Sequence, residues 1–121
     1  MNHNQFKDKV VVITGASGGV GRATAWEFAK QGAKVALLAR GMEQLEATKS
    51  EVEAYGGKAL IIQCDVADAN QVEAAAEQTE RKLGEIDVWV NNAMASVLAP
   101  FKEITFARGG YQRVVSRGGE T

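Results

Sequence analysis

Short runs that are apolar at almost every position alternate along the chain with longer segments that mix apolar and polar residues. We expect strands at Lys9–Thr14, Lys34–Ala39, Lys58–Gln63 and Ile86–Asn91. Because the apolar residues fill successive positions, each strand is expected to be covered on both faces. Strands of this kind that alternate with helices are typical of right-handed βαβ units and a parallel sheet. The pattern therefore predicts an α/β fold.

The intervening segments predict three helices, because their apolar residues recur at three- and four-residue spacing. These segments are Val20–Gln31, Met42–Tyr55 and Ala69–Leu83, and each is followed by glycine, a frequent helix stop. No repeat and no linker interrupts the alternation. The chain is expected to form one domain or part of one.

The last stretch has a different character. Between Phe101 and Thr121 the periodicity fades, and two Gly-Gly pairs stand among three arginines. This glycine content argues against a stable helix. We expect residues 106–121 to form an atypical tail that contains glycine and arginine. A nucleic-acid-binding Arg/Gly segment is the disfavoured alternative, since the stretch is short and its arginines are sparse.

Charge and cysteine content narrow the class of protein. The 121 residues carry a formal net charge of −1, which excludes neither nucleic acid nor membrane lipid as a partner but offers no basic surface for either. No apolar run approaches the roughly 20 residues that span a bilayer, and the polar start Met1–Lys9 lacks the apolar core of a secretory signal. The single Cys64 is interpreted as a buried small hydrophobe, and an unpaired cysteine suits a reducing compartment. We expect a cytoplasmic protein without nucleic-acid or membrane partners.

The strongest candidate for chemistry is the glycine-rich turn Thr14–Gly21, which joins the first expected strand to the first expected helix. Free backbone N–H groups and the positive end of the helix dipole face one point there, where a phosphate can sit. Glycine leaves room for the tight turn and for a pyrophosphate. A P-loop is disfavoured, because Arg22 and Ala23 stand where Lys and Ser or Thr would be needed. The turn predicts a dinucleotide site, with an empty glycine turn as the alternative.

The spacing Thr-Gly-x-x-x-Gly-x-Gly in this turn resembles the cofactor loop of the short-chain dehydrogenase/reductase family. The resemblance implies a Rossmann-like doubly wound parallel sheet with strand order 3-2-1-4, here truncated after about four strands. It also implies an oxidoreductase that transfers hydride between a nicotinamide cofactor and a carbonyl or alcohol carbon. The residues of the turn expected at the cofactor are Thr14, Gly15, Ser17, Gly19, Val20 and Gly21.

Asp65 and Val66 follow the third expected strand. At the carboxyl end of a strand, the Asp65 carboxylate could accept a hydrogen bond from an adenine amino group or cap the next helix. Asp68 is better placed for the cap. An Asp-Val pair at this position contacts adenine in the family that the chain resembles, which favours the adenine contact.

The fourth expected strand ends in Asn91, Asn92 and Ala93, which look like the Asn-Asn-Ala-Gly signature of the same family. The resemblance implies that these amides tie neighbouring strand ends together and border the cofactor. Met94 stands where the family has glycine and is expected to crowd or line the pocket if it lies near the nicotinamide.

Arg40 ends the second strand, about 20 residues after the turn, where a dinucleotide fold places the residue that meets the adenosine ribose. An acidic residue there would bind the 2′-hydroxyl and repel a phosphate. An arginine offers a charge-assisted hydrogen bond to a 2′-phosphate instead. We therefore expect NADP(H) to be preferred over NAD(H), with a solvated Arg40 as the alternative.

The catalytic signature of the family is not found. The resemblance implies a Tyr-x-x-x-Lys pair, but Tyr55 is followed four residues later by Ala59, and Tyr111 by Val115. We assign no catalytic and no metal-ligating residue. Residues 1–105 are expected to form a partial NAD(P)-binding domain that is catalytically incomplete. The alternative is a non-catalytic nucleotide-binding or dimerisation module, which would form a homo- or hetero-oligomer through an exposed, unpaired fourth-strand edge.

Overall fold

The computed structural model describes residues 5–16, 18–92, 101–106 and 112–117, and in the last two ranges the description covers the backbone. Every helix lies between two of the first four strands in the chain order. The strands are β1 (Val10–Thr14), β2 (Lys34–Ala39), β3 (Lys58–Gln63), β4 (Val88–Asn91), β5 (Phe101–Phe106) and β6 (Gln112–Arg117). The helices are α1 (Gly19–Lys30), α2 (Met42–Ala54) and α3 (Ala69–Lys82).

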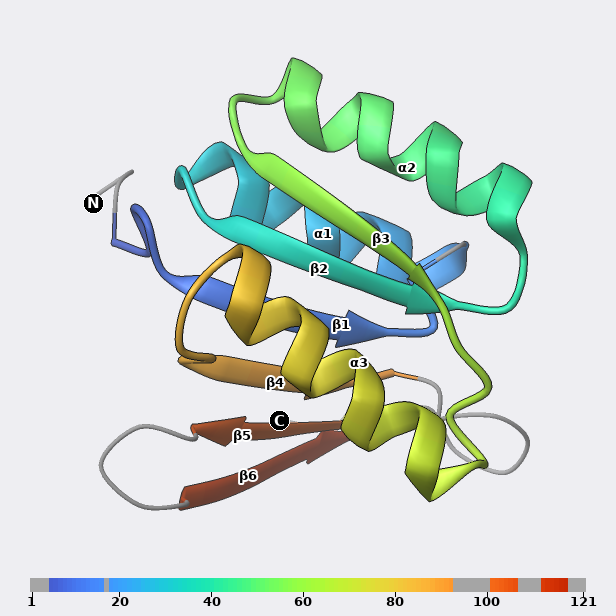
Figure 1. Cartoon of the computed structure of the whole chain (residues 1–121). Coiled ribbons are helices and arrows are strands. Elements are labelled where there is room, and N and C mark those ends of the chain that lie inside the picture. The colour runs from blue at the N-terminus through green and yellow to red at the C-terminus, as the bar shows by residue number, and fades with distance from the viewer. Residues whose placement is uncertain (1–4, 17, 93–100, 107–111, 118–121) are drawn as a thin grey trace.

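The strands form one sheet in the order β3-β2-β1-β4-β5-β6 (Figure 1). The pairs β1–β2, β1–β4 and β2–β3 are parallel. This confirms the α/β prediction and the Rossmann-like order 3-2-1-4. The chain reverses its direction across the sheet between β1 and β4, which is where such folds bind ligands.

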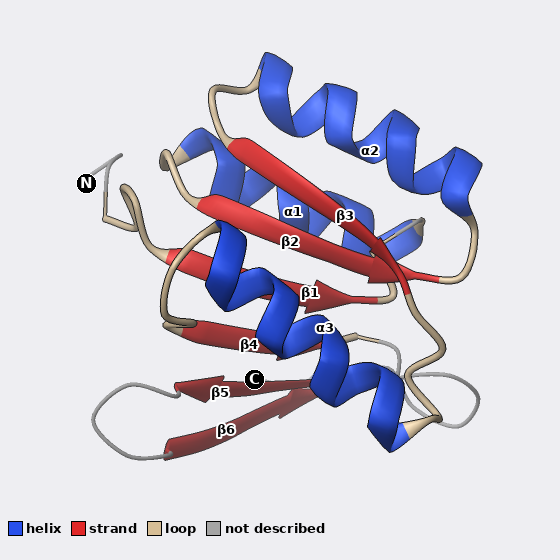
Figure 2. Cartoon of the chain, viewed as in Figure 1, coloured by secondary structure: helices blue, strands red, loops and turns tan. Residues whose placement is uncertain are grey.

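Helices cover both faces of the parallel strands: α1 and α2 pack on one face and α3 on the other (Figure 2). Successive residues of each strand enter opposite cores, because side chains alternate across a sheet. In β1, Val11 and Ile13 join the core of α1 and α2, whereas Val10 and Val12 face α3. Cys64 belongs to the α3 core and is 3% exposed, which confirms it as a buried hydrophobe.

The predicted helices agree with the observed ones to within one residue at each end. Gly32, Gly56 and Gly84 follow the three helices with φ of 79°, 103° and 117°, a backbone conformation that favours glycine. Asp68 is the N-cap of α3, and its Oδ1 accepts hydrogen bonds from the backbone N–H groups of Asn70 and Gln71. The cap thus falls to Asp68 rather than to Asp65.

The expectation of an unpaired fourth-strand edge is wrong. β4 pairs antiparallel with β5 in the register Val88↔Phe106, and β5 pairs antiparallel with β6. β6 lies within the stretch expected to be an atypical tail. The hairpin satisfies backbone N–H and C=O groups that a bare β4 would leave open. Both strands contain β-branched residues suited to a sheet, which the glycine pairs around them obscured in the sequence.

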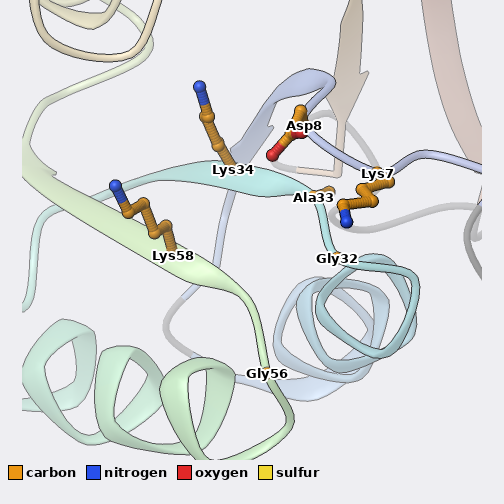
Figure 3. Close-up of a pocket in the computed structure, with 7 residues that line it drawn as sticks. All are labelled: Lys7, Asp8, Gly32, Ala33, Lys34, Gly56 and Lys58. Carbon is orange, nitrogen blue, oxygen red and sulfur yellow. The ribbon is translucent and has the colours of Figure 1, made fainter.

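A hollow of about 630 Å³ lies at the amino ends of β2 and β3 (Figure 3). Lys34 and Lys58 open these two strands and are register partners, so their side chains extend from the same face of the sheet. Like charges directly opposite each other destabilise a sheet. Lys7 and Asp8 add one charge of each sign at the rim and leave the hollow with a net positive charge.

Replacing Lys58 by glutamate is expected to stabilise the fold by about 0.2–1 kcal/mol, because a cross-strand ion pair then replaces a repulsive pair. Urea unfolding would measure the change in the free energy of unfolding. Lys58→Gln, which removes the repulsion without adding attraction, is expected to give part of the gain. The gain should shrink in 1 M NaCl, where charges are screened within about 3 Å. A loss of stability in Lys58→Glu at low salt would contradict the prediction.

Candidate functional site

A cleft of about 810 Å³ opens at the carboxyl ends of the parallel strands, at the opposite end of the sheet from the lysine hollow. It combines the glycine turn after β1 with the segments that follow β2 and β3. Its lining residues are Gly15, Ala39, Arg40, Gly41, Gln44, Cys64, Asp65, Val66 and Ala67. Residues predicted from three separate places in the sequence therefore meet at one site.

The glycine turn brings α1 close to the end of β1. Gly15 and Gly19 have φ of 63° and 57°, which favour glycine. Gly21 is buried, and a Cβ added to it would lie 2.8 Å from the carbonyl carbon of Gly15 and 3.2 Å from the Cα of Ala16. A side chain at position 21 would therefore force the first turn of α1 away from β1.

The amino end of α1 has features that suit an anion. Its N-cap, Gly18, makes no side-chain cap, and its first turn contains no acidic residue. The first N–H groups of a helix have no partner within the helix and carry its positive partial charge. Val20 lies in this first turn and is 55% exposed. Ser17, the remaining predicted residue of the turn, lies outside the described residues.

Arg40 and Asp65 face the cleft from neighbouring strand ends. Gln63 Nε2 donates to the backbone carbonyl of Arg40 at 2.8 Å and links the segments that follow β2 and β3. The Arg40 side chain is exposed and forms no ion pair within the described part of the chain. Asp65 Oδ1 accepts from the backbone N–H of Ala67 at 3.0 Å, which fixes the carboxylate beside the cleft.

The end of β4 lies beside the end of β1. Thr14 and Asn91 are register partners, and Thr14 Oγ1 donates to Asn91 Oδ1 at 3.1 Å. Trp89 Nε1 donates to the same oxygen at 3.3 Å. Asn91 thus ties the two strand ends together, as the resemblance implied. Ala93 and Met94 lie outside the described residues.

Asn92 carries an unmet hydrogen-bonding requirement. Its side-chain Oδ1 and Nδ2 are both buried and have no hydrogen-bond partner among the residues that the structure describes. Leaving a buried polar group unsatisfied costs about 1–3 kcal/mol. A polar ligand seated beside the ends of β1 and β4 would relieve that cost.

The family model for short chain dehydrogenases matches residues 9–117. The chain belongs to the short-chain dehydrogenase family.

Relatives in this family match most of this chain. A 3beta-hydroxysteroid dehydrogenase of Mediterraneibacter gnavus is 39% identical over 89 residues, which are 74% of this chain and 32% of the relative. The L-sorbose reductase of Gluconobacter frateurii, solved with NADPH and L-sorbose, is 36% identical with a TM-score of 0.67 over 72% of this chain and 33% of that one. The NAD+-bound xylitol dehydrogenase is 36% identical with a TM-score of 0.66, over 69% of this chain and 32% of the xylitol dehydrogenase chain.

This short-chain dehydrogenase chain thus spans about a third of the length of the relatives that it matches. Solved relatives include one with NAD+ and one with NADPH, so the family uses either nicotinamide dinucleotide. The placement of the glycine turn at the switch point between β1 and β4 agrees with such a cofactor.

The sequence analysis did not predict four residues of the cleft, which are Ala39, Gly41, Gln44 and Ala67. Gly41 is the N-cap of α2, and Gln44 lies in its first turn, close to Gly41. The sequence does indicate Gly41 and Gln44, because a helix that begins directly after Arg40 places its first turn beside the same cleft.

Cys64 also lines the cleft, but its chemistry argues against a nucleophile. Burial raises the pKa of its thiol, and the negative charges of Asp65 and Asp68 raise that pKa further. The thiol therefore stays protonated at neutral pH. In the part of the chain that the structure describes, no three His, Cys, Asp or Glu side chains gather where a metal ion could bind, and no helix is long and apolar enough to cross a membrane.

Proposed function

We propose that this chain is the NADP(H)-binding portion of a short-chain dehydrogenase/reductase. The observation that supports the proposal most is the convergence of Gly15, Arg40 and Asp65 on one cleft. The uncapped amino end of α1 and the unsatisfied Asn92 amide fit the same ligand. The residues proposed to bind the cofactor are Thr14, Gly15, Ser17, Gly19, Val20, Gly21, Arg40, Asp65, Val66, Asn91, Asn92 and Ala93.

The preference for NADP(H) rests on Arg40, which stands where an acidic residue would select NAD(H). Its exposed guanidinium is free to form a charge-assisted hydrogen bond with a 2′-phosphate. Such a bond contributes about 1.5–3 kcal/mol, or roughly ten- to hundred-fold in affinity. The carboxylate of Asp65 is proposed to accept a hydrogen bond from the adenine amino group.

The whole protein is proposed to transfer hydride between the cofactor and a carbonyl or alcohol carbon. The bound cofactor supplies the hydride chemistry, and the described residues of this chain bind and orient it. The 121-residue chain itself is not expected to turn over. Tyr55 follows the carboxyl end of α2, about 20 Å along the helix from Arg40, and neither Tyr55 nor Tyr111 has a lysine four residues later. A non-catalytic nucleotide-binding module is the alternative function.

The lone buried cysteine supports a further proposal, that the protein works in the reducing cytoplasm.

Calorimetric titration of the purified chain with NADPH and, in parallel, with NADH tests the proposal. We expect saturable binding of both, with the Kd for NADPH roughly ten- to hundred-fold lower. Equal affinities would overturn the role of Arg40, and the absence of any binding would overturn the proposed cofactor site. NADPH-dependent turnover of a carbonyl substrate by the pure chain would overturn its catalytic incompleteness and the non-catalytic alternative.

A further inference from the structure

Two residues of α2 contact the glycine turn. In the sequence, α1 and β2 lie between the turn and this helix. The first contact is Thr48, which is fully buried on α2. Its Oγ1 lies 3.3 Å from the carbonyl oxygen of Ala16, in the turn, and 3.0 Å from that of Gln44, in its own helix. A helix-interior threonine commonly satisfies its hydroxyl within its own helix. Here the single hydroxyl hydrogen is shared with a buried carbonyl of the turn.

The second contact is an ion pair between Arg22, which directly follows Gly21, and Glu51 on α2. Arg22 Nε donates to Glu51 Oε1 at 2.8 Å, and the second guanidinium nitrogen donates to Oε2. This forked geometry fixes orientation as well as distance. Trp26 Nε1 donates to Oε1 at 2.7 Å. The hydrogen bonds from Arg22 and Trp26 lower the pKa of Glu51 to about 2, so the carboxylate is charged at neutral pH.

The two contacts lie on either side of the turn and on one face of α2. Thr48 and Glu51 are three residues apart, which places them on the same side of a helix. Ala16 precedes the bend of the turn and Arg22 follows it. Both flanks of the turn are therefore tied to one rigid element, whose first turn also lines the cleft through Gln44.

We infer that Thr48 and Glu51 are positioning residues that hold the glycine turn in its phosphate-binding conformation. The inference rests on the proposed function. A turn with this many glycines loses more backbone freedom on ordering than a turn of the same length without glycine. If the turn were ordered only by the cofactor, that cost would weaken binding. Contacts from α2 impose the order beforehand, so that the N–H groups at the start of α1 already converge on the phosphate.

Amide hydrogen exchange of the cofactor-free chain tests whether Thr48 and Glu51 keep the glycine turn ordered. The backbone N–H of Ala16 donates to Leu38 and that of Arg22 donates to Gly18, so both amides report local opening. Thr48→Val and Glu51→Gln are each expected to speed exchange at these two amides by about three- to tenfold. Exchange at the β2 amides should stay unchanged. Thr48→Ser, which keeps the hydroxyl, is expected to restore the original rate.

The matched control is Glu53→Gln, an identical change of charge at an exposed position of α2 whose side chain forms no hydrogen bond or ion pair in the described part of the chain. It should leave both exchange rates unaltered. Unchanged exchange at Ala16 and Arg22 in Thr48→Val and Glu51→Gln would overturn the inference. Equal acceleration at the β2 amides would also overturn it, because the two residues would then stabilise the fold as a whole.

Calorimetric titration with NADPH completes the test. Thr48→Val and Glu51→Gln are expected to raise the Kd by about three- to tenfold, and Glu53→Gln to leave it unchanged. Faster exchange at Ala16 and Arg22 without any change in the Kd for NADPH would overturn the proposal that these contacts assist cofactor binding. If the unaltered chain bound no NADPH, the proposed function would fall, whereas faster local exchange in the variants would still support the hold of α2 on the turn.

Discussion

Alanine at position 21 is expected to abolish measurable NADPH binding and to lower the free energy of unfolding. The added methyl group would lie 2.8 Å from the Gly15 carbonyl carbon, and backbone rather than a flexible side chain blocks its way. Such overpacking costs about 1–3 kcal/mol. The first turn of α1 would have to move, which misdirects its N–H groups. Losing two hydrogen bonds to a charged phosphate weakens binding by at least about a hundredfold.

Calorimetric titration and urea unfolding of Gly21→Ala would measure both effects. The matched control is Gly18→Ala in the same turn. Gly18 has an extended backbone, with φ of −170°, and a Cβ there would meet nothing within 4 Å. We expect that variant to lose at most about 1 kcal/mol of stability, since alanine is a poorer N-cap than glycine, and to bind NADPH within a fewfold of the unaltered chain. Normal NADPH binding by Gly21→Ala would show that the close approach of α1 to β1 is not needed.

Replacing Arg40 by aspartate is expected to reverse the cofactor preference. The change removes the bond proposed between Arg40 and the 2′-phosphate, which would contribute about 1.5–3 kcal/mol, and places a negative charge beside that phosphate. The Kd for NADPH should therefore rise by more than about tenfold. The Kd for NADH should fall or stay the same, since the carboxylate can accept hydrogen bonds from the ribose hydroxyls. Titration with both cofactors gives the ratio of the two constants directly.

Two controls accompany this change. Arg81→Asp makes the same change of charge near the end of α3, at an exposed residue outside the cleft. It should leave the NADPH/NADH ratio unaltered, which separates local recognition from the effect of net charge. Arg40→Ala should weaken NADPH binding without improving NADH binding. A ratio that stays the same in Arg40→Asp would refute the assignment of Arg40 to the phosphate.

The pairing of β4 with β5 is a feature that local sequence patterns do not predict. The antiparallel register Val88↔Phe106 joins residues separated by a stretch without clear periodicity. An edge strand accepts either direction of partner, and its own sequence does not say which segment will come. The glycine pairs in residues 106–121 argued against a helix. They did not reveal the strand Gln112–Arg117 that lies between them.

The α2 contacts with the glycine turn lie beyond sequence analysis for a related reason. Thr48 reads as one polar position in a helix, and Glu51 as one of several acidic ones. Their partners Ala16 and Arg22 lie 32 and 29 residues away. Which threonine or glutamate meets the turn depends on how α2 is rotated and where it crosses α1, and both are set by packing of the whole core.

The sequence by itself determined the parallel strands, the three helices, the strand order through the family resemblance, and the glycine turn. These features rest on signals within a few residues: apolar periodicity, helix stops, and glycine where a positive φ or a close approach is required. Only the tertiary structure decided the partner of β4, the common cleft of Arg40 and Asp65, and the hold of α2 on the turn. Each of these joins distant residues, and the free energy that selects such a contact comes from burying the surrounding core rather than from the residues themselves.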